Sequence, residues 1–256
     1  MNSALHVKAL LLAAGLGTRL RPITNTIPKC LVTIDDRPLL GYWLELLSEA
    51  GVAAGDVLIN LHHHADAVWK FLSEDPLGRG VRTVYETELL GTGGTLLANA
   101  DFFTSAANGV RPTVLFVHAD NLSLFSLHDF IERHRARPAS VEITMMTFRT
   151  DAPQTFGIVE LDERDVVQKF HEKQANPPGN LANGAVYLLE ASVLDFLKSL
   201  GKNFIDFSLD VIPAYLGRIQ IFQNDIYHRD IGNLDSLEIA RRTFPPVYNK
   251  FHRISI

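Results

Sequence analysis

The sequence is poor in cysteine and has no long hydrophobic run. Its single cysteine, Cys30, has no partner for a disulfide within the chain, which suits a reducing compartment. No cationic N-terminal stretch precedes a long apolar segment, and no apolar run reaches the length of a membrane span. We therefore expect a cytoplasmic protein that does not engage a membrane.

An excess of positive charge is also missing. Acidic residues outnumber basic ones by 29 to 24, giving a net charge of −5, which argues against a general nucleic-acid binder. Clusters of basic residues therefore indicate local sites. Hydrophobic residues make up 46% of the 256 positions, enough for the sizeable core of one large domain.

Two common phosphate-binding loops are absent. No Gly-x-x-x-x-Gly-Lys-Ser/Thr string occurs, which excludes a Walker A loop. Gly15 and Gly17 match the first two glycines of a dinucleotide-binding fingerprint, but Leu20 replaces the third and is too bulky for close helix–strand packing.

The sequence does contain the stretch Leu-Ala-Ala-Gly-Leu-Gly-Thr-Arg-Leu-Arg-Pro at residues 12–22, followed by Pro28 and Lys29. It comes directly after an apolar run. Glycines that follow a strand in the sequence let backbone N–H groups approach phosphates, and Arg and Lys side chains neutralise phosphate charge. The stretch therefore predicts a polyphosphate site, the alternative being a surface turn with solvated arginines.

This stretch resembles the signature of the sugar-phosphate nucleotidylyltransferases. Further segments resemble that family in the family's order, and the resemblance covers roughly residues 7–240. They are Glu88–Gly94, His118–Asn121, Phe156–Glu160, Glu172-Lys173, Asn183–Ala185 and Asp230–Gly232. The resemblance implies a Rossmann-like, three-layer α/β fold of the GT-A-like nucleotidyltransferase type, with a central, mostly parallel mixed sheet.

The order of elements agrees with an α/β fold. Apolar, β-branched runs alternate with helical patterns in the first half, as in a mostly parallel sheet covered on both faces. There we predict strands over 7–13, 57–61, 81–86 and 113–117, and helices over 39–50, 66–72 and 95–103. In the second half we predict strands over 141–148 and 185–189, an antiparallel pair over 157–161 and 166–171, and helices over 194–200, 207–215 and 236–242.

The resemblance also implies the domain organisation. We expect a single nucleotidyltransferase domain over 1–256, with a nucleotide-binding half over about 1–125 and a sugar-binding half over about 126–256. Residues 105–112 are predicted to form a surface loop. No hexapeptide repeat is present, so we expect no C-terminal β-helix with an acyltransferase activity.

The implied reaction joins an NTP and a sugar 1-phosphate to give an NDP-sugar and pyrophosphate. The attacking phosphate is already anionic, so no serine, cysteine or histidine nucleophile is needed. Catalysis then depends on positioning and charge neutralisation. In this frame Arg19 holds the departing phosphates, and Lys29 holds the attacking and α-phosphates.

The resemblance implies that Asp120 and Asp230 together hold one Mg²⁺, which prefers hard oxygen ligands and substrate phosphates. Asp120 follows the predicted strand 113–117, at the strand end where ligands bind in α/β sheets. Spacing alone leaves solvated or capping roles open for both aspartates.

The remaining site residues also follow from the resemblance. The expected nucleotide-binding residues are Leu12, Ala13, Ala14, Gly15, Gly17, Thr18, Arg19, Glu88, Gly91 and Thr92. The expected sugar-phosphate-binding residues are Lys29, Asn121, Gly157, Glu172, Lys173 and Asn183. A carboxylate accepts hydrogen bonds from sugar hydroxyls and a lysine meets a phosphate, but a surface ion pair is the alternative for Glu172 and Lys173.

Two histidine features have no assigned role. His62, His63 and His64 are adjacent at a predicted strand end and point in different directions, so we do not expect them to share a metal ion. His228 lies where many relatives have tryptophan; it either contacts the sugar or indicates a different arrangement around it.

The substrates are predicted from the same resemblance. Ala13-Ala14-Gly15 and the segment 90–94 resemble mannose-1-phosphate guanylyltransferases most, which favours GTP and a mannose 1-phosphate-like substrate. The alternatives are dTTP, UTP or CTP with glucose 1-phosphate. A catalytically silent, nucleotide-sugar-sensing subunit is the alternative of another class. A homodimer is expected from the family.

Overall fold

The computed structural model describes residues 6–105 and 111–254, and the chain divides into two compact units. Unit 1 contains the chain up to Leu10, Leu89–Val117 and His128–Gln223, and unit 2 contains Leu11–Glu88, His118–Leu127 and the chain from Asn224 onward. Of the predicted surface loop 105–112, residues 106–110 lie outside the described residues.

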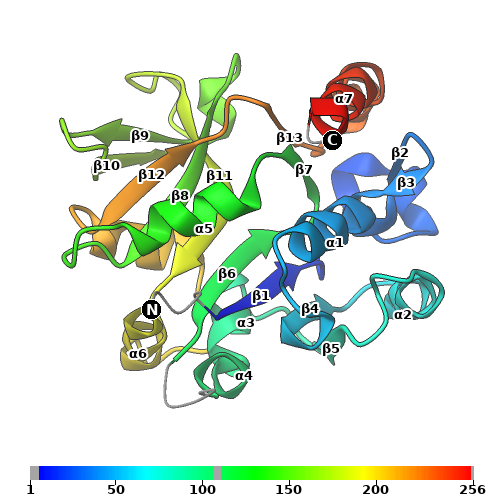
Figure 1. Ribbon diagram of the computed structural model, residues 1–256, viewed down its shortest axis with the longest axis horizontal. Coiled ribbons are helices and arrows are strands. Elements are labelled where there is room, and N and C mark those ends of the chain that lie inside the picture. Colours follow the sequence, from blue (N-terminus) through cyan, green and yellow to red (C-terminus); the bar gives the residue numbers. More distant parts are fainter. Residues whose placement is uncertain (1–5, 106–110, 255–256) are drawn as a thin grey trace. The chain divides into compact units, whose positions relative to one another are not determined.

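Unit 1 is built on a mixed sheet in the order β10-β9-β11-β6-β1, with β8 pairing both β11 and β12 (Figure 1). The strands are β1 (Val7–Leu12), β6 (Thr113–His118), β8 (Ile143–Arg149), β9 (Gly157–Leu161), β10 (Val167–Glu172), β11 (Leu181–Leu189) and β12 (Ile219–Gln223). β11 is antiparallel to β6, β8 and β9, whereas β12 and β8 are parallel. The mixed sheet is confirmed, and this part of it is more antiparallel than the sequence predicts.

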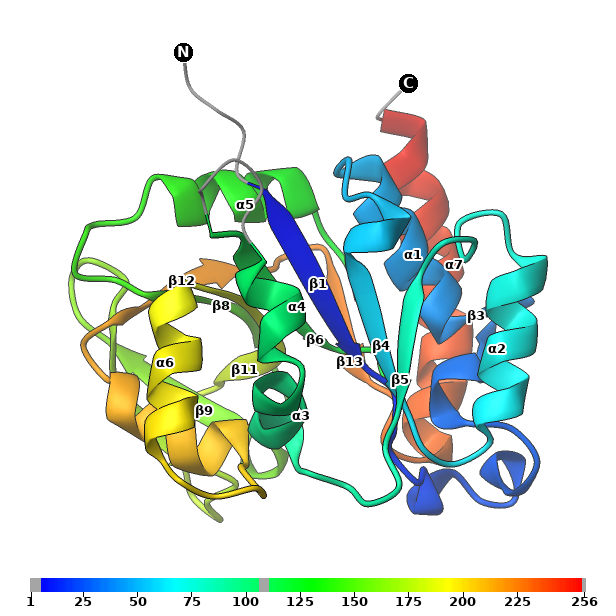
Figure 2. The same cartoon turned by 90° about the horizontal axis from the view of Figure 1, so that it is seen from below.

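The helices of unit 1 are α3 (Thr92–Ala98), α4 (Ala100–Thr104), α5 (Leu127–Arg135) and α6 (Ala191–Ser199). Figure 2 shows α3, α4 and α6 side by side. The single helix predicted over 95–103 is wrong, because the chain leaves helical geometry at Asn99, whose side-chain amide donates to the Thr95 carbonyl. Residues 207–215 form a π-helical turn followed by a 3₁₀ turn, not one α-helix.

Unit 2 combines a parallel strand pair with several short elements. Its strands are β2 (Thr33–Ile34), β3 (Arg37–Pro38), β4 (Val57–Leu61), β5 (Arg82–Tyr85), β7 (Asn121–Leu124) and β13 (Tyr227–Asp230). β4 and β5 are parallel, and β7 and β13 are antiparallel. Its helices are α1 (Leu39–Glu49), α2 (Ala65–Glu74) and α7 (Leu234–Ile254). The short strands β7 and β13 were not predicted from the sequence.

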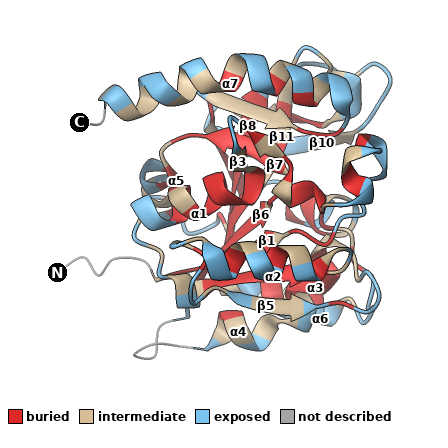
Figure 3. Cartoon of the chain, turned by 90° about the vertical axis from the view of Figure 1, so that its right-hand side faces the viewer, coloured by how far each residue is buried: buried red, intermediate tan, exposed pale blue. Residues whose placement is uncertain are grey.

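A shared apolar core holds α1 and α7 to the β7–β13 pair. It includes Tyr42 of α1, Leu122 of β7, and Leu237 and Phe244 of α7. Exposed and buried residues alternate along α7 (Figure 3). This packing explains why α7 is far longer than the predicted 236–242: it continues through Pro245 and Pro246, although proline normally kinks or breaks a helix interior.

Within the described ranges, no helix combines the length and the apolar composition that crossing a membrane requires.

Candidate functional site

Three charged side chains from distant parts of the chain meet in unit 2. The ammonium of Lys29 lies 2.7 Å from Asp120 Oδ2 and 3.2 Å from Asp230 Oδ1. Lys29 is 7% exposed, so this cation is almost completely removed from water. A buried charge is tolerated when it is paired, and here two carboxylates provide the pairing. We call these three residues the carboxylate–lysine site.

The β7–β13 pair explains how the two aspartates come together. Asp120 occupies the turn between β6 and β7, and Asp230 is the last residue of β13. In the antiparallel register Asp230 lies opposite Asn121, the residue after Asp120. Strand pairing therefore places the two carboxylates as neighbours although 110 positions separate them in the sequence (230 − 120).

The ion pairs also set the protonation states. Burial alone would lower the pKa of Lys29, but the charges of Asp120 and Asp230 outweigh it and raise that pKa above its ordinary value. Burial would likewise raise the pKa of Asp120, but Lys29 and His118 hold it below its ordinary value. At neutral pH the site therefore holds one ammonium and an ionised Asp120. Burial raises the pKa of the neighbouring Cys30 to about 12, which keeps it a neutral thiol.

The glycine-rich loop packs directly against this lysine. Gly17 has φ 60°, and a Cβ there would lie 3.0 Å from Thr24 Cγ2 and 3.3 Å from Lys29 Cβ. A side chain at this position is therefore disfavoured by conformation and by space. Thr24 Oγ1 donates to the Gly17 carbonyl at 2.7 Å and fixes the turn. Gly15 is exposed, and a Cβ there would meet nothing within 4 Å, so a ligand can approach its backbone from that side.

Arg19 lies on the same side as Asp230. A Cβ on Gly232 would be 2.8 Å from Asp230 Oδ2 and 3.4 Å from an Arg19 Nη atom, so both side chains border this glycine. Arg19 is exposed and forms no ion pair within residues 6–105 and 111–254. Its guanidinium is therefore available to an anion.

Two polar residues that support the loop were not predicted from the sequence. The Ala13 N–H donates to Asn60 Oδ1 at 2.8 Å, and Asn60 Nδ2 donates to Glu86 Oε1 at 3.1 Å. Asn60 and Glu86 are 3% and 6% exposed. The available signal was an asparagine inside the apolar strand 57–61, since a buried amide requires partners. Glu88, the predicted residue nearby, is exposed.

Gly91 and Thr92 lie in unit 1, where both contact other residues of the same unit. A Cβ on Gly91 would lie 2.6 Å from the Ile205 carbonyl oxygen. The Thr92 hydroxyl accepts a hydrogen bond from the Phe207 N–H at 2.9 Å. These contacts hold the start of α3 against residues 205–207. A nucleotide contact by Gly91 or Thr92 stays a prediction.

Three predicted sugar-phosphate residues meet in unit 1. Gly157 and Glu172 are register partners in the β9–β10 pair, and Lys173 Nζ lies 3.0 Å from Glu172 Oε1. A Cβ on Gly157 would lie 2.2 Å from Phe170 Cζ and 2.7 Å from Glu172 Oε2. The absence of a side chain at Gly157 therefore leaves room for the Glu172 carboxylate.

The side chain of Asn183 forms hydrogen bonds with other residues of its own strand, β11. Its Nδ2 donates to the Tyr187 hydroxyl at 2.6 Å, and its Oδ1 accepts from the Ala185 N–H at 3.0 Å. Ala185 has φ 53° at an irregularity of β11. Asn183 therefore has a structural role, and its predicted sugar contact is untested.

The unassigned histidines also have local partners. His62 Nδ1 lies 2.7 Å from the Glu86 carbonyl oxygen, and the rings of His63 and His64 are 3.8 Å apart. His228 Nδ1 lies 2.6 Å from Ser123 Oγ across the β7–β13 pair. Burial lowers the pKa of His228 to about 3, with a further contribution from Arg229, so its imidazole is neutral at physiological pH.

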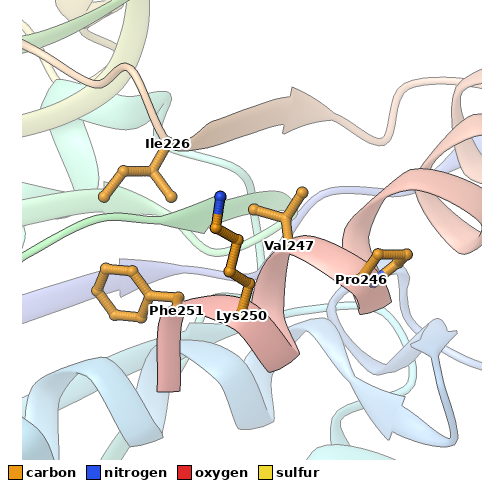
Figure 4. A pocket seen from close by; sticks show the side chains of 5 residues that line it. All are labelled: Ile226, Pro246, Val247, Lys250 and Phe251. Carbon is orange, nitrogen blue, oxygen red and sulfur yellow. The ribbon is translucent and has the colours of Figure 1, made fainter. Parts of the chain in front are cut away.

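A pocket of about 550 Å³ lies beside α7 and contains no predicted site residue. Ile226, Pro246, Val247, Lys250 and Phe251 line it (Figure 4). Its lining is almost entirely apolar, and therefore does not suit a triphosphate.

Sequence comparison now defines the class of protein. A family model described as nucleotidyl transferase matches residues 8–244, and the chain belongs to this family.

Among its relatives, a protein of Oryza sativa subsp. japonica named probable mannose-1-phosphate guanylyltransferase 1 is 35% identical over 192 residues. That match covers 74% of this chain and 51% of the relative. The mannose-1-phosphate guanyltransferase of Pichia angusta is 31% identical over 234 residues, covering 88% of this chain and 61% of the relative. The chain thus spans between about half and three fifths of the length of these curated relatives.

The structural comparison agrees on the fold. HddC from Yersinia pseudotuberculosis, solved in complex with GMP-PN, superimposes with a TM-score of 0.75 at 24% identity. The match covers 94% of this chain and 100% of that one. The predicted α/β, Rossmann-like fold is confirmed.

The loop support can be tested with Asn60→Ala. This change removes the acceptor of the buried Ala13 N–H, and an unsatisfied buried donor costs about 1–3 kcal/mol. We expect the free energy of unfolding from urea titration to fall by about that amount. Asn249→Ala, an exposed position on α7, is the control and should change it by less than about 0.5 kcal/mol. Equal effects of the two changes would contradict a supporting role for Asn60.

Gly157→Ala tests the close packing in unit 1. The added methyl must displace Phe170 and Glu172, and overpacking of this kind costs about 1–3 kcal/mol. We expect a lower melting temperature than in the wild type. Gly179→Ala is the matched control, since a Cβ there meets nothing within 4 Å. A Gly157→Ala protein as stable as the control would show that the β9–β10 pair adjusts freely.

Proposed function

We propose that this chain transfers a nucleotidyl group from an NTP to a sugar 1-phosphate, giving an NDP-sugar and pyrophosphate. The observation that carries the proposal is the convergence of Lys29 on Asp120 and Asp230 beside the glycine-rich loop. The names of the relatives support an enzyme of this type.

In the proposed reaction a phosphate oxygen of the sugar 1-phosphate attacks the α-phosphorus of the NTP. The bond from the α-phosphorus to the oxygen bridging it to the β-phosphate breaks, and pyrophosphate leaves. The nucleophile is anionic, so no proton has to be removed from it. The enzyme must therefore overcome repulsion between two anions and hold them in line.

The described side chains fit these tasks. The backbone of the loop 15–18 would bind the triphosphate, and the exposed Arg19 would hold the departing β- and γ-phosphates. Lys29 would bind the attacking and α-phosphates, exchanging part of its carboxylate contact for phosphate oxygens. Glu172 and Lys173 would bind the sugar 1-phosphate.

Asp120 and Asp230 fit a Mg²⁺ ion. Their carboxylates converge on one cation already, and carboxylate oxygens are the donors that Mg²⁺ prefers. When bound there, Mg²⁺ would supply positive charge that neutralises the substrate phosphates. The depressed pKa of Asp120 keeps its carboxylate ionised through the neutral range, ready to bind a cation.

The names of the relatives favour GTP and mannose 1-phosphate as substrates. dTTP, UTP or CTP with glucose 1-phosphate are the alternatives. The cytoplasmic location and the homodimer remain predictions from the sequence.

Asp120→Asn tests the mechanism. Losing one carboxylate of the pair should lower pyrophosphate release by about 100-fold, equivalent to about 3 kcal/mol of transition-state stabilisation. Asp66→Asn, an exposed change on α2, should leave the rate unaltered. Equal rates in the wild type and Asp120→Asn would refute the mechanism, and no turnover in any protein would favour the silent sensing subunit.

An activity matrix of four NTPs against mannose 1-phosphate and glucose 1-phosphate tests the specificity. We expect the highest kcat/KM with GTP and mannose 1-phosphate, measured by pyrophosphate release with Mg²⁺ present. Turnover confined to dTTP or UTP would overturn the guanylyl assignment while leaving the reaction class intact.

A further inference from the structure

A second cluster of metal-binding side chains lies away from the carboxylate–lysine site. Glu45 and Glu49 lie one turn apart on α1, and His252 lies near the end of α7. One ligand atom from each of the three lies within 4.8 Å of the other two. The helices are held together nearby, with the rings of Tyr42 and Tyr248 5.3 Å apart. The cluster therefore bridges two packed helices of unit 2.

The ring of His252 is oriented by the backbone. Its Nδ1 lies 3.0 Å from the Tyr248 carbonyl oxygen, and because a carbonyl only accepts, Nδ1 carries the proton of this hydrogen bond. In the neutral ring Nε2 then presents its lone pair, 3.4 Å from Glu49 Oε1. Nε2 and the Glu49 carboxylate can then both offer an electron pair to a cation that lies between them. Metal-binding histidines are commonly oriented by such a carbonyl contact.

The carboxylate of Glu45 is positioned as well. Its Oε2 accepts from the Tyr248 hydroxyl at 2.5 Å and pairs with Arg37 Nη1 at 2.8 Å. The side chains of Glu45 and Glu49 are 22% and 48% exposed, so an ion can enter from solvent.

The local charge favours a cation. Arg37 balances one of the two carboxylates and leaves one negative charge. Glu49 is the last residue of α1, where the helix dipole adds further negative potential.

We propose that Glu45, Glu49 and His252 form a binding site for a divalent first-row transition ion of the Zn²⁺ class. One imidazole and two carboxylates are a donor set that suits Zn²⁺, with water completing a tetrahedral sphere, whereas Mg²⁺ prefers oxygen ligands alone. The ion would link α1 to the last turns of α7. The site lies about 27 Å along α7 from the end that follows Asp230, so it is separate from the proposed reaction.

Zinc titration of the full chain without nucleotide tests the proposal. We expect saturable binding of one Zn²⁺ by calorimetry and a higher melting temperature with Zn²⁺ but not with Mg²⁺. His252→Gln and Glu49→Gln should each weaken the affinity by about tenfold or more. Glu74→Gln is the matched control: this exposed glutamate pairs with Lys70 on α2 and should leave zinc binding unchanged.

The same series made on Asp120→Asn separates this site from the proposed catalytic one. Zinc binding that survives Asp120→Asn and is lost on adding His252→Gln supports the proposal. X-ray absorption at the zinc edge should show an imidazole nitrogen at about 2.0 Å.

Two results would overturn the site. One is equal zinc affinity in the wild type, His252→Gln and Glu49→Gln. The other is the absence of saturable zinc binding, combined with an NMR-monitored pH titration of His252 whose midpoint changes in Glu49→Gln. That combination would identify a simple imidazolium–carboxylate pair. Circular dichroism of each variant establishes that it is folded.

Discussion

The buried ammonium of Lys29 is the interaction on which unit 2 depends. It contacts carboxylates from the turn after β6 and from the end of β13, and its own backbone follows the glycine-rich loop. Three distant parts of the chain are thus fixed by one cation. Removing Lys29 would leave two neighbouring carboxylates without a cation between them, so the approach of Asp120 to Asp230 depends on this lysine.

Two short strands bring Asp120 and Asp230 together around Lys29. β7 and β13 have four residues each, yet their register determines where Asp230 lies relative to Asp120. The apolar residues behind them, including Leu122, Leu124 and Ile231, belong to the core that also holds α1 and α7. The geometry of the charged groups therefore rests on hydrophobic packing that none of them takes part in.

Because packing between distant segments positions the charged groups, only part of the site could be predicted from the sequence. The loop 12–22 and the strand before Asp120 were predicted from local patterns, and both positions agree with the structure. The approach of Asp230 could not be derived from spacing, because it depends on pairing between short strands that lie far apart in the sequence. The resemblance supplied it instead. Asn60 and Asn183 needed the structure, since hydrogen-bond partners determine whether a buried amide supports the fold or faces a ligand.

The charges of the carboxylate–lysine site also constrain how it can work. Two carboxylates and one ammonium carry a net charge of −1, which would repel a triphosphate. A divalent cation would change that sum to +1, and the exposed Arg19 would add a further positive charge beside Asp230. For the proposed reaction, therefore, the two aspartates can attract the substrate phosphates only when they hold a metal ion. In its absence Lys29 is their partner, 2.7 Å from Asp120 Oδ2 and 3.2 Å from Asp230 Oδ1.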